Sequence, residues 1–461
     1  MITRILIRTA AGAAIFAAWA CLGAGAVSAQ TVGGGKPTHT ATPIKHFITL
    51  MQENHSFDNY FGTYPGADGL PPKTCIPVRP ADRDPCVRPY HIDSKAALTD
   101  IGHDHRSFQK DYDGGRMDGF VAALADQGNQ NYTQAMGYYD ARDIPFYWNL
   151  ADNYVLFDHQ FTSANTGSMA NHMFWVAAAR GVGRGDRIPA RGLTIPTIFD
   201  RLQAAGVSWK FYVQNYDPRV TYRHQGRGNH IAQTIYVPIL NLARFLDNPS
   251  LSSHIVPLSQ YYNDLDHGTL PAVAYIAPSG DSEHPPSNIA SGERFVHVLL
   301  GALMRSSAWD TSAFMLSYDD WGGWYDHVKP PRVDAYGYGF RSPALLVSPY
   351  AKRGFVDHTV LDFTSQVKFI EQNWGLKPLA RRDAAARGLV SAFDFSKTAR
   401  RAVMLGFERH PPPPVHPRAG VVYLAYGGAI GAFAAAVGVA AARRRWPLLN
   451  GREASSGGLG S

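Results

Sequence analysis

Residues 44–62 read IKHFITLMQENHSFDNYFG. The apolar run 44–50 predicts a short buried strand, and the polar residues Glu53 and Asn54 follow it directly. In an α/β protein, ligands bind at the carboxyl ends of the strands of the central sheet. A carboxylate beside an amide oxygen at such a point suits a hard divalent cation. The stretch therefore predicts one wall of a metal site at the edge of a sheet.

Strand-like and helix-like segments alternate on both sides of this stretch. We expect strands at 44–51, 207–213, 272–277, 313–317 and 344–348, and helices at 168–180, 197–205, 292–306 and 361–374. Such alternation predicts an α/β fold with a central, mostly parallel sheet and helices on both faces. The segments 65–150 and 214–270 are rich in Pro, Gly, Tyr and Asp, and we expect them to form long loops that cap the edge of the sheet.

A second predicted strand also ends in acids. Residues 316–327 read LSYDDWGGWYDH, so that Asp319 and Asp320 follow the apolar run and His327 comes seven residues later. Adjacent carboxylates repel each other unless a cation or strong donors hold them. The alternative is a solvated acidic turn, but the likeness to Glu53-Asn54 favours a second wall of the same metal site.

A serine precedes the predicted helix 168–180. Residues 163–172 read SANTGSMANH. A serine at a helix N-terminus lies beside free backbone N–H groups, which suits an incoming phosphate. The alternative is that Ser168 or Thr166 only caps the helix. The sequence is not the Gly-x-Ser-x-Gly elbow of serine hydrolases.

Two further segments place acids and histidines in expected loops. Residues 280–286 read GDSEHPP and follow the strand at 272–277, whereas residues 100–105 read DIGHDH and are followed by GGRMDGF at 114–120. A single histidine is usually structural or exposed. These segments nevertheless fall where a substrate cap is expected.

Taken in order, these blocks resemble the phosphoesterase family that includes bacterial phospholipases C and acid phosphatases. The resemblance covers roughly 44–375 and uses the blocks 53–58, 103 with 114–120, 168–172, 281–286 and 318–331. It implies a three-layer α/β sandwich of the alkaline phosphatase type and a divalent metal ion of unspecified identity. It implies as metal ligands Glu53, Asn54, Asp319, Asp320 and the oxygen of Ser168.

The same resemblance implies catalytic roles. It makes Ser168 the nucleophile, matches Asn171 to an asparagine of the family pattern, and places His103 and His284 around the phosphate. His327 also matches a family histidine, with a catalytic or a structural role left open, and Asp281 begins a matching block. Thr166 is the alternative nucleophile.

The chain also departs from the family pattern. His55 stands where the family has Arg, Ala170 where it has Pro, and His172 where it has Arg. Ser168 followed by Asn171 and His172 resembles the acid-phosphatase-like branch. The expected function is hydrolysis of phosphate esters through a phosphoserine, with cleavage of phosphatidylcholine-type lipids by a phospholipase C as the alternative.

Two rival functions are weighed against this expectation. A sulfatase-like enzyme needs a Cys/Ser-x-Pro-x-Arg context, which residues 168–172 lack. A non-catalytic surface protein that binds metal or carbohydrate would use its many Tyr and Trp side chains for stacking and would need no serine at the metal.

Both ends of the chain predict export. Residues 1–29 have a positive start, an apolar stretch and the small residues Val27-Ser28-Ala29 typical of a cleaved signal peptide, with a retained anchor as the alternative. Residues 421–442 are apolar over on the order of 33 Å, enough to span a bilayer, and the arginines at 443–445 predict a cytoplasmic tail at 443–461. The alternative is a buried Ala-rich helix. A catalytic domain at 30–410, periplasmic or extracellular, would thus hang from a transmembrane helix through the Pro-rich linker 411–420.

Charge and cysteine content fit that topology. The formal net charge is +7, of which the leader carries two and residues 443–461 carry a net three, leaving +2 for residues 30–442. This small charge gives no case for nucleic-acid binding. After the leader only Cys75 and Cys86 remain, and in an oxidising compartment an even pair predicts a disulfide that closes a short loop.

Overall fold

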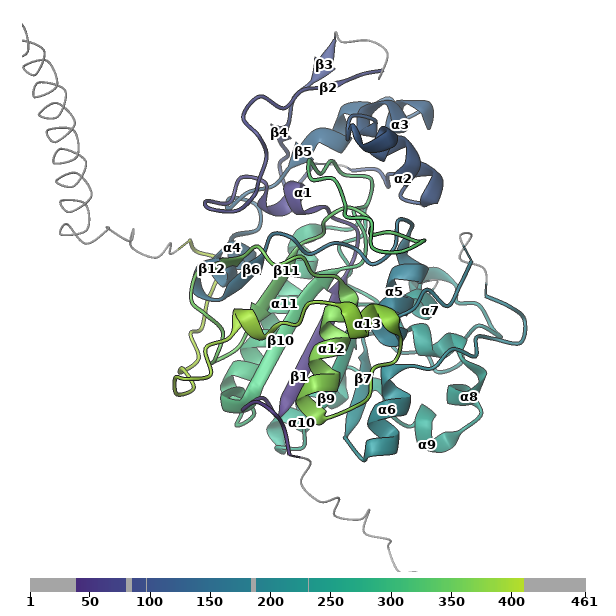
Figure 1. Cartoon of the computed structure of the whole chain (residues 1–461), viewed down its shortest axis with the longest axis vertical. Coiled ribbons are helices and arrows are strands. Elements are labelled where there is room, and N and C mark those ends of the chain that lie inside the picture. Colours follow the sequence, from purple (N-terminus) through teal and green to yellow (C-terminus); the bar gives the residue numbers. More distant parts are fainter. Residues whose placement is uncertain (1–38, 80–84, 97, 184–187, 231, 410–461) are drawn as a thin grey trace, which may run out of the picture. The chain divides into compact units, whose positions relative to one another are not determined.

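The computed structural model describes residues 39–79, 85–96, 98–183, 188–230 and 232–409. An eight-stranded sheet lies at its centre (Figure 1). From edge to edge the strands are β12 (Phe355–Asp357), β6 (Val155–Phe157), β11 (Ala344–Val347), β10 (Ser312–Tyr318), β1 (His46–Gln52), β9 (Val273–Ala277), β7 (Trp209–Val213) and β8 (Ile255–Pro257). The pairs are parallel except that β11 runs antiparallel to both of its neighbours. The predicted α/β class with a mostly parallel sheet is confirmed.

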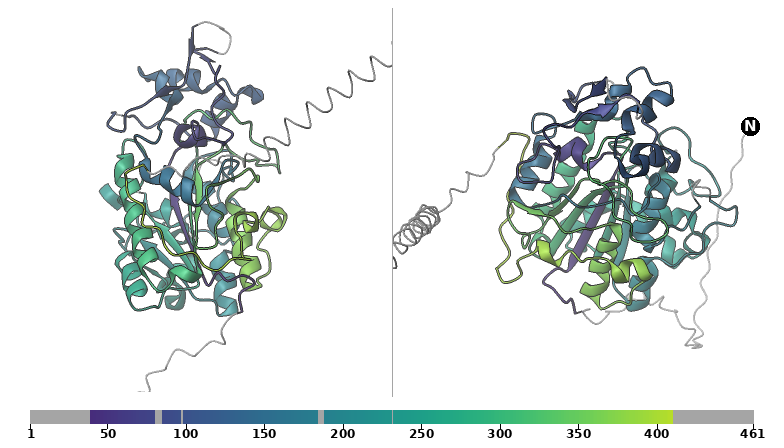
Figure 2. Two further views of the ribbon diagram at one scale, coloured as in Figure 1. Left: turned by 90° about the vertical axis from the view of Figure 1, so that its left-hand side faces the viewer. Right: turned by 45° about the horizontal axis from the view of Figure 1, so that its top comes forward.

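Helices cover both faces of the sheet (Figure 2). One face carries α5 (Ser168–Ala177), α6 (Ile198–Ala205) and α12 (Phe363–Trp374), and the other carries α4 (Pro145–Asn153), α10 (Ser259–Asp266) and α11 (Ile289–Arg305). Two alternate residues of β1 contact the helices of the first face. The ring of Phe47 lies 5.0 Å from that of Phe369 on α12, and Nε1 of Trp175 on α5 donates to Thr49 across 3.0 Å. Because helices bury both faces of the sheet, the central strands consist mainly of continuous apolar runs.

Residues beyond the carboxyl end of β1 form a cap (Figure 1, purple and blue). It contains α1 (Phe57–Phe61), α2 (His105–Tyr112) and α3 (Phe120–Asp126), with the short strand pairs β2 (Ile76–Pro77) with β3 (Cys86–Val87) and β4 (Tyr90–His91) with β5 (Gly137–Tyr138). A disulfide joins Cys75 to Cys86, with 5.5 Å between their Cα atoms.

The prediction that 65–150 and 214–270 are long loops was wrong in part. The first segment contains α2, α3 and α4, and the second contains α7 (Gln233–Tyr236), α8 (Ala243–Leu246), α9 (Pro249–Ser252), the edge strand β8 and α10. Most of these elements are eight residues or shorter, too short for a hydrophobic period to stand out.

Among the described residues, no helix is long and apolar enough to cross a membrane. The predicted signal peptide 1–29, linker 411–420, transmembrane helix 421–442 and tail 443–461 lie outside the described residues.

Candidate active site

The two acidic strand ends lie side by side at one edge of the sheet. Strands β1 and β10 pair in parallel with Gln52 opposite Tyr318, so that Glu53 and Asp319 leave the sheet together. The backbone N–H of Asn54 donates to Oδ1 of Asp319 (3.3 Å). Glu53, Asn54, Asp319 and Asp320 are all buried. The two acidic strand ends, predicted from their similar sequences to be two walls of one site, therefore lie together in space.

A glycine turn allows this close approach. Gly322 has a φ of +60°, and a Cβ there would lie 2.3 Å from the backbone oxygen of Asn54. Its N–H donates to Oδ1 of Asp320 (2.8 Å). Asn54 itself has a φ of +59°, a conformation that asparagine tolerates better than most residues. The turn after β10 thus holds the end of β1 against the two aspartates.

Helix α5 brings Ser168 to the same carboxylates. Ser168 is the first residue of the helix, after the extended N-cap residue Gly167. Its hydroxyl donates to Oδ2 of Asp320 across 3.3 Å. Backbone N–H groups at this helix end are free to face an anion. Thr166 is also buried, but its hydroxyl has no hydrogen-bond partner among the described residues, and Ser168 is therefore the better placed of the two candidates.

Burial and mutual repulsion make the carboxylates of this cluster costly to keep charged. Among the described residues, no lysine or arginine forms an ion pair with Glu53 or Asp319. Burial raises the pKa of Glu53 well above its ordinary value, and the charges of Asp319 and Asp320 raise it further. Burial and the charge of Asp320 raise the pKa of Asp319 to about 8. A bound divalent cation would remove this cost, because it is the counter-charge that such oxygens prefer.

The amide of Asn54 fits a cation as well. One of its two terminal atoms lies 2.9 Å from Oδ1 of Asp319 and 3.3 Å from Oε2 of Glu53, and the other lies 3.1 Å from Nε2 of His103 and 3.0 Å from Nε2 of His284. Nδ1 of each ring lies against a backbone carbonyl, that of Ile101 (2.7 Å) and that of Pro285 (2.6 Å).

All four contacts are satisfied when the NH₂ group of Asn54 faces Oδ1 of Asp319 and Oε2 of Glu53 and its oxygen faces Nε2 of His103 and of His284. A half-turn of the amide group exchanges its two terminal atoms. In that orientation its oxygen would face a cation held by the two carboxylates, and the donor set would suit a hard divalent ion.

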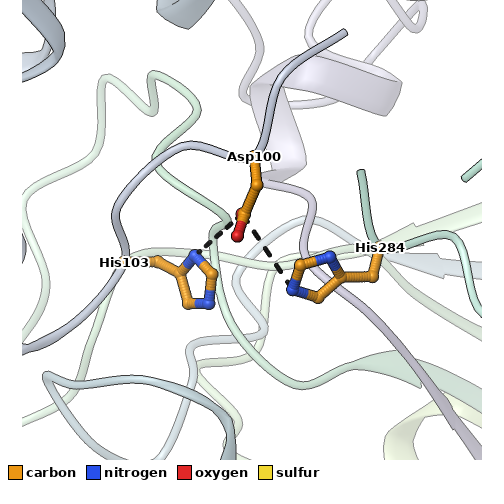
Figure 3. A group of neighbouring side chains, drawn as sticks. All are labelled: Asp100, His103 and His284. Atoms are coloured by element: carbon orange, nitrogen blue, oxygen red, sulfur yellow. Dashed lines mark ion pairs between the residues drawn. The ribbon is translucent and has the colours of Figure 1, made fainter. Parts of the chain in front are cut away.

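The two histidines lie together at the rim of this cluster (Figure 3). The ring centroids of His103 and His284 are 5.6 Å apart. Oδ1 of Asp100 lies 3.7 Å from Nδ1 of His103 and 4.0 Å from Nε2 of His284. Their imidazoles are only partly exposed, and they can exchange protons with a ligand at the cluster. Asp100 is a neighbour that the sequence did not single out.

Three other predicted residues do not face the carboxylates. Asn171 bonds to the backbone of the segment before Ser168: it accepts from Ala164 N–H (2.8 Å) and donates to the carbonyl of Thr166 (2.9 Å). These contacts hold the backbone before Ser168 in place, and the catalytic role expected of Asn171 stays a prediction.

Asp281 and His327 are tied into the surrounding structure. Asp281 accepts from Gln214 (2.5 Å) and from the hydroxyl of Ser291. His327 pairs through Nδ1 with Asp58 (2.7 Å), which also binds the buried Arg341 (3.0 Å). These contacts place His327 in an ion-pair network with Asp58 and Arg341.

Two residues near the site were quoted in the sequence analysis but were assigned no role in the site. The buried carboxylate of Glu283 accepts from the hydroxyls of Tyr60 (2.6 Å), Tyr147 (2.5 Å) and Tyr318 (2.8 Å), and so anchors the backbone beside His284. The second residue is His172, whose Nε2 lies 3.4 Å from Oε1 of Glu53. Their signal in the sequence is that they lie within the site blocks 281–286 and 168–172.

Ser168 opens onto a cavity of about 870 Å³. Its lining is mixed. The apolar lining residues are Met169, Ile188, Pro189, Ala190, Tyr222 and Ile235, and the polar ones include His103, Asp104, Arg106, Ser107, Lys110, Asp126 and Gln127. The cavity can therefore accommodate a ligand that has both apolar and polar portions.

Comparisons with known proteins agree with the chemistry of the cluster. The model of the Phosphoesterase family matches residues 44–377. Phospholipase C A of Mycobacterium tuberculosis is 29% identical over 446 aligned residues, which cover 84% of each chain. Hemolytic phospholipase C of Pseudomonas aeruginosa is 30% identical over 78% of this chain and 57% of its own length. A protein of the alkaline phosphatase superfamily from Vibrio parahaemolyticus superposes with a TM-score of 0.33 at 12% identity, covering 75% of this chain and 74% of that one.

The family match contains the four acidic and amide side chains of the cluster, the serine at the start of α5 and both rim histidines. The relatives carry the name of an enzyme that cleaves phosphoric esters. From the match over most of its length, the chain belongs to the Phosphoesterase family and is a phosphoric ester hydrolase.

Proposed function

We propose that this enzyme cleaves phosphate esters by transferring the phosphoryl group to Ser168. The observation that carries the proposal is the hydrogen bond from the Ser168 hydroxyl to Asp320 (3.3 Å), beside the buried carboxyl groups of Glu53 and Asp319, whose pKa values are raised. Glu53, Asn54, Asp319 and Asp320 would hold a divalent cation. When bound, such an ion supplies a Lewis acid for the phosphoryl oxygens and lowers the pKa of the serine hydroxyl.

The residues of the chain account for the two steps. In the first step, the oxygen of Ser168 forms a bond to phosphorus while the bond to the leaving alcohol breaks, and Asp320 accepts the hydroxyl proton. The free N–H groups at the start of α5 face the phosphoryl oxygens. His103 or His284 gives a proton to the leaving alkoxide. In the second step, water attacks the phosphoserine while the bond between phosphorus and the Ser168 oxygen breaks. A histidine takes the proton from that water, and Asp320 returns its proton to the serine oxygen.

For the substrate we propose a phospholipid phosphodiester. Two relatives that are aligned over most of their own length are named phospholipases C, and the cavity beside Ser168 includes apolar lining residues that could contact a diacylglycerol portion. A phosphate monoester is the second candidate, because the serine followed by Asn171 and His172 resembles the acid-phosphatase-like pattern.

One experiment tests mechanism and substrate together. The purified full-length protein is assayed on phosphatidylcholine vesicles and on an aryl phosphate monoester, with and without a chelator. We expect lipid turnover to exceed monoester turnover, to stop with chelator and to return with added divalent cation. Full turnover by Ser168→Ala would disprove the mechanism, and activity on the monoester alone would assign the second candidate.

We further propose that the enzyme acts outside the cytoplasm while tethered to the membrane. The support is the sequence of residues 1–29 and 421–442. Cell fractionation of the full-length protein and of a variant that ends at residue 410 provides the test. The full-length protein should fractionate with membranes and be digested by external protease in spheroplasts, whereas the shorter variant should be released. A full-length protein found in the soluble cytoplasmic fraction would refute the proposal.

A further inference from the structure

A buried imidazole faces the predicted metal ligands from helix α5. The side chain of His172 is 1% exposed. It lies one helical turn after Ser168, and its Nδ1 is 3.0 Å from the carbonyl oxygen of Ser168. Because that oxygen only accepts, Nδ1 carries the hydrogen, and Nε2 of the neutral ring presents a lone pair toward the carboxylates.

Three buried atoms beside this ring lack hydrogen-bond partners. Among the described residues, Nε2 of His172, Oε1 of Glu53 and Oδ2 of Asp319 have none. Nε2 is 3.4 Å from Oε1 of Glu53, whereas Oδ2 of Asp319 lies 3.8 Å from Nδ1 of the same ring, and one ligand atom from each of the three residues lies within 4.8 Å of the others. Leaving a buried polar group unsatisfied is costly, and a cation bound among the three residues would remove that cost.

The spacing suits two ligands of one ion. Nitrogen and oxygen ligands lie about 2.0–2.2 Å from zinc in a tetrahedral site, which puts neighbouring ligands about 3.4 Å apart. A histidine that binds metal through one nitrogen also donates its other N–H to a carboxylate or a backbone carbonyl, which fixes the tautomer and the ring orientation. His172 makes such a bond to Ser168.

We propose that Nε2 of His172 is a further ligand of the divalent cation held by Glu53 and Asp319. The site then has a nitrogen donor among oxygens, and it favours zinc-class transition metals over Mg²⁺ and Ca²⁺, whose preferred ligands are all oxygen. Arginine, the residue of the family pattern at this position, cannot donate a lone pair, so this ligand is a feature of this chain. The inference rests on the proposed cation site.

The first test detects nitrogen at the ion directly. The full-length protein is loaded with one equivalent of Mn²⁺ and studied by electron spin-echo envelope modulation, once with natural histidine and once with ¹⁵N-histidine. We expect ¹⁴N modulation that changes to the ¹⁵N pattern on labelling. This arm uses the wild-type protein and does not depend on the folding of a variant. Absence of nitrogen modulation would overturn the proposal.

The second test uses His172→Asn. An asparagine there keeps an N–H near the Ser168 carbonyl but has no counterpart of Nε2. Its Zn²⁺ affinity, measured by competition with a chromophoric chelator, should fall about 10- to 100-fold, and the nitrogen modulation should disappear. Its Mg²⁺ affinity should stay unchanged. Equal loss of both affinities would mean that the substitution disturbs the site as a whole and would also overturn the proposal.

A matched control is His254→Asn, because Nδ1 of His254 also bonds a backbone carbonyl, that of Trp209 (2.7 Å), outside the carboxylate cluster. It should bind both ions as the wild type does.

Failure of this inference can be told apart from failure of the proposed function. Turnover that needs a cation, with no nitrogen ligand detected, would disprove only the role of His172 as a ligand. Turnover that survives full chelation would disprove the metal-dependent mechanism.

Discussion

The hydroxyl of Ser168 and the carboxylate of Asp320 form a hydrogen bond of 3.3 Å between residues 152 positions apart in the chain. This bond joins the start of helix α5 to the end of strand β10. It also favours Ser168 as the nucleophile over Thr166, the other candidate hydroxyl.

We therefore expect Ser168→Ala to lower turnover at least about 10³-fold while Thr166→Val retains most of it. Acid quenching during turnover, followed by peptide mass spectrometry, should find a phosphoryl group on Ser168 in the wild type and in Thr166→Val. A phosphoryl group on Thr166, or none on either residue with turnover intact, would contradict the assignment.

Asn171 should affect the rate through position alone. It holds the segment 164–167 by bonds to Ala164 N–H and to the carbonyls of Thr166 and Gly167 (2.8, 2.9 and 3.2 Å). Asn171→Leu removes these bonds, and a shift of Ser168 by about 1 Å is expected to lower kcat about 10²-fold. Cation affinity and KM should stay close to wild type. Asn263→Leu on an exposed position of α10 is the control, and a large rise in KM for Asn171→Leu would show direct contact with substrate instead.

Arg341 should contribute to stability more than any surface arginine. It is fully buried and pairs with Asp58 (3.0 Å) and Asp326 (2.9 Å). Arg341→Met leaves two carboxylates buried without their partner, which should cost about 3–5 kcal/mol in the free energy of unfolding. Arg219→Met removes an exposed pair with Asp217 (2.8 Å) and should change the free energy of unfolding far less, because water screens an exposed ion pair. Urea denaturation of both variants measures the difference, and equal effects would refute it.

His327 should make stability depend on pH. Burial alone would lower its pKa, but the hydrogen bond and charge of Asp58, with the charge of Asp326, raise it above the ordinary value of 6.5. The folded protein thus binds this proton more tightly than the unfolded chain. The stabilisation is complete below the unfolded pKa and is lost as pH rises through the folded pKa.

Urea denaturation of the wild type and of His327→Gln over about pH 5–9 measures this contribution. The difference in unfolding free energy between the two proteins should be largest at the acidic end and should shrink as pH rises. A difference that stays constant with pH would show that His327 does not titrate in this range.

The sequence predicted the strands best where apolar runs were long. The runs ending at Glu53-Asn54 and Asp319-Asp320 correspond to β1 and β10, but only the fold shows that these two strands are neighbours. Strands β6 and β12 have three residues each, too few for a period to be recognised.

The site residues, like the strands, could be predicted from the sequence only in part. Oxygen ligands after strands could be predicted because the carboxyl ends of parallel strands share one edge. His172 and Glu283 contact side chains that are far from them in the sequence, and a local sequence pattern cannot predict such contacts. Asn171 and His327 could be located, but their hydrogen-bond partners come from packing.

The pairing of β1 with β10 also determines when the cluster can exist. Asn54 and Asp319 are separated by 265 positions, so no nascent chain that ends before β10 contains both halves. Contacts of such high sequence separation form slowly, because the loop-closure entropy must be lost before the contact compensates for it. Cation capture would consequently be a late event in biogenesis, one that reports completion of the sheet rather than nucleating it.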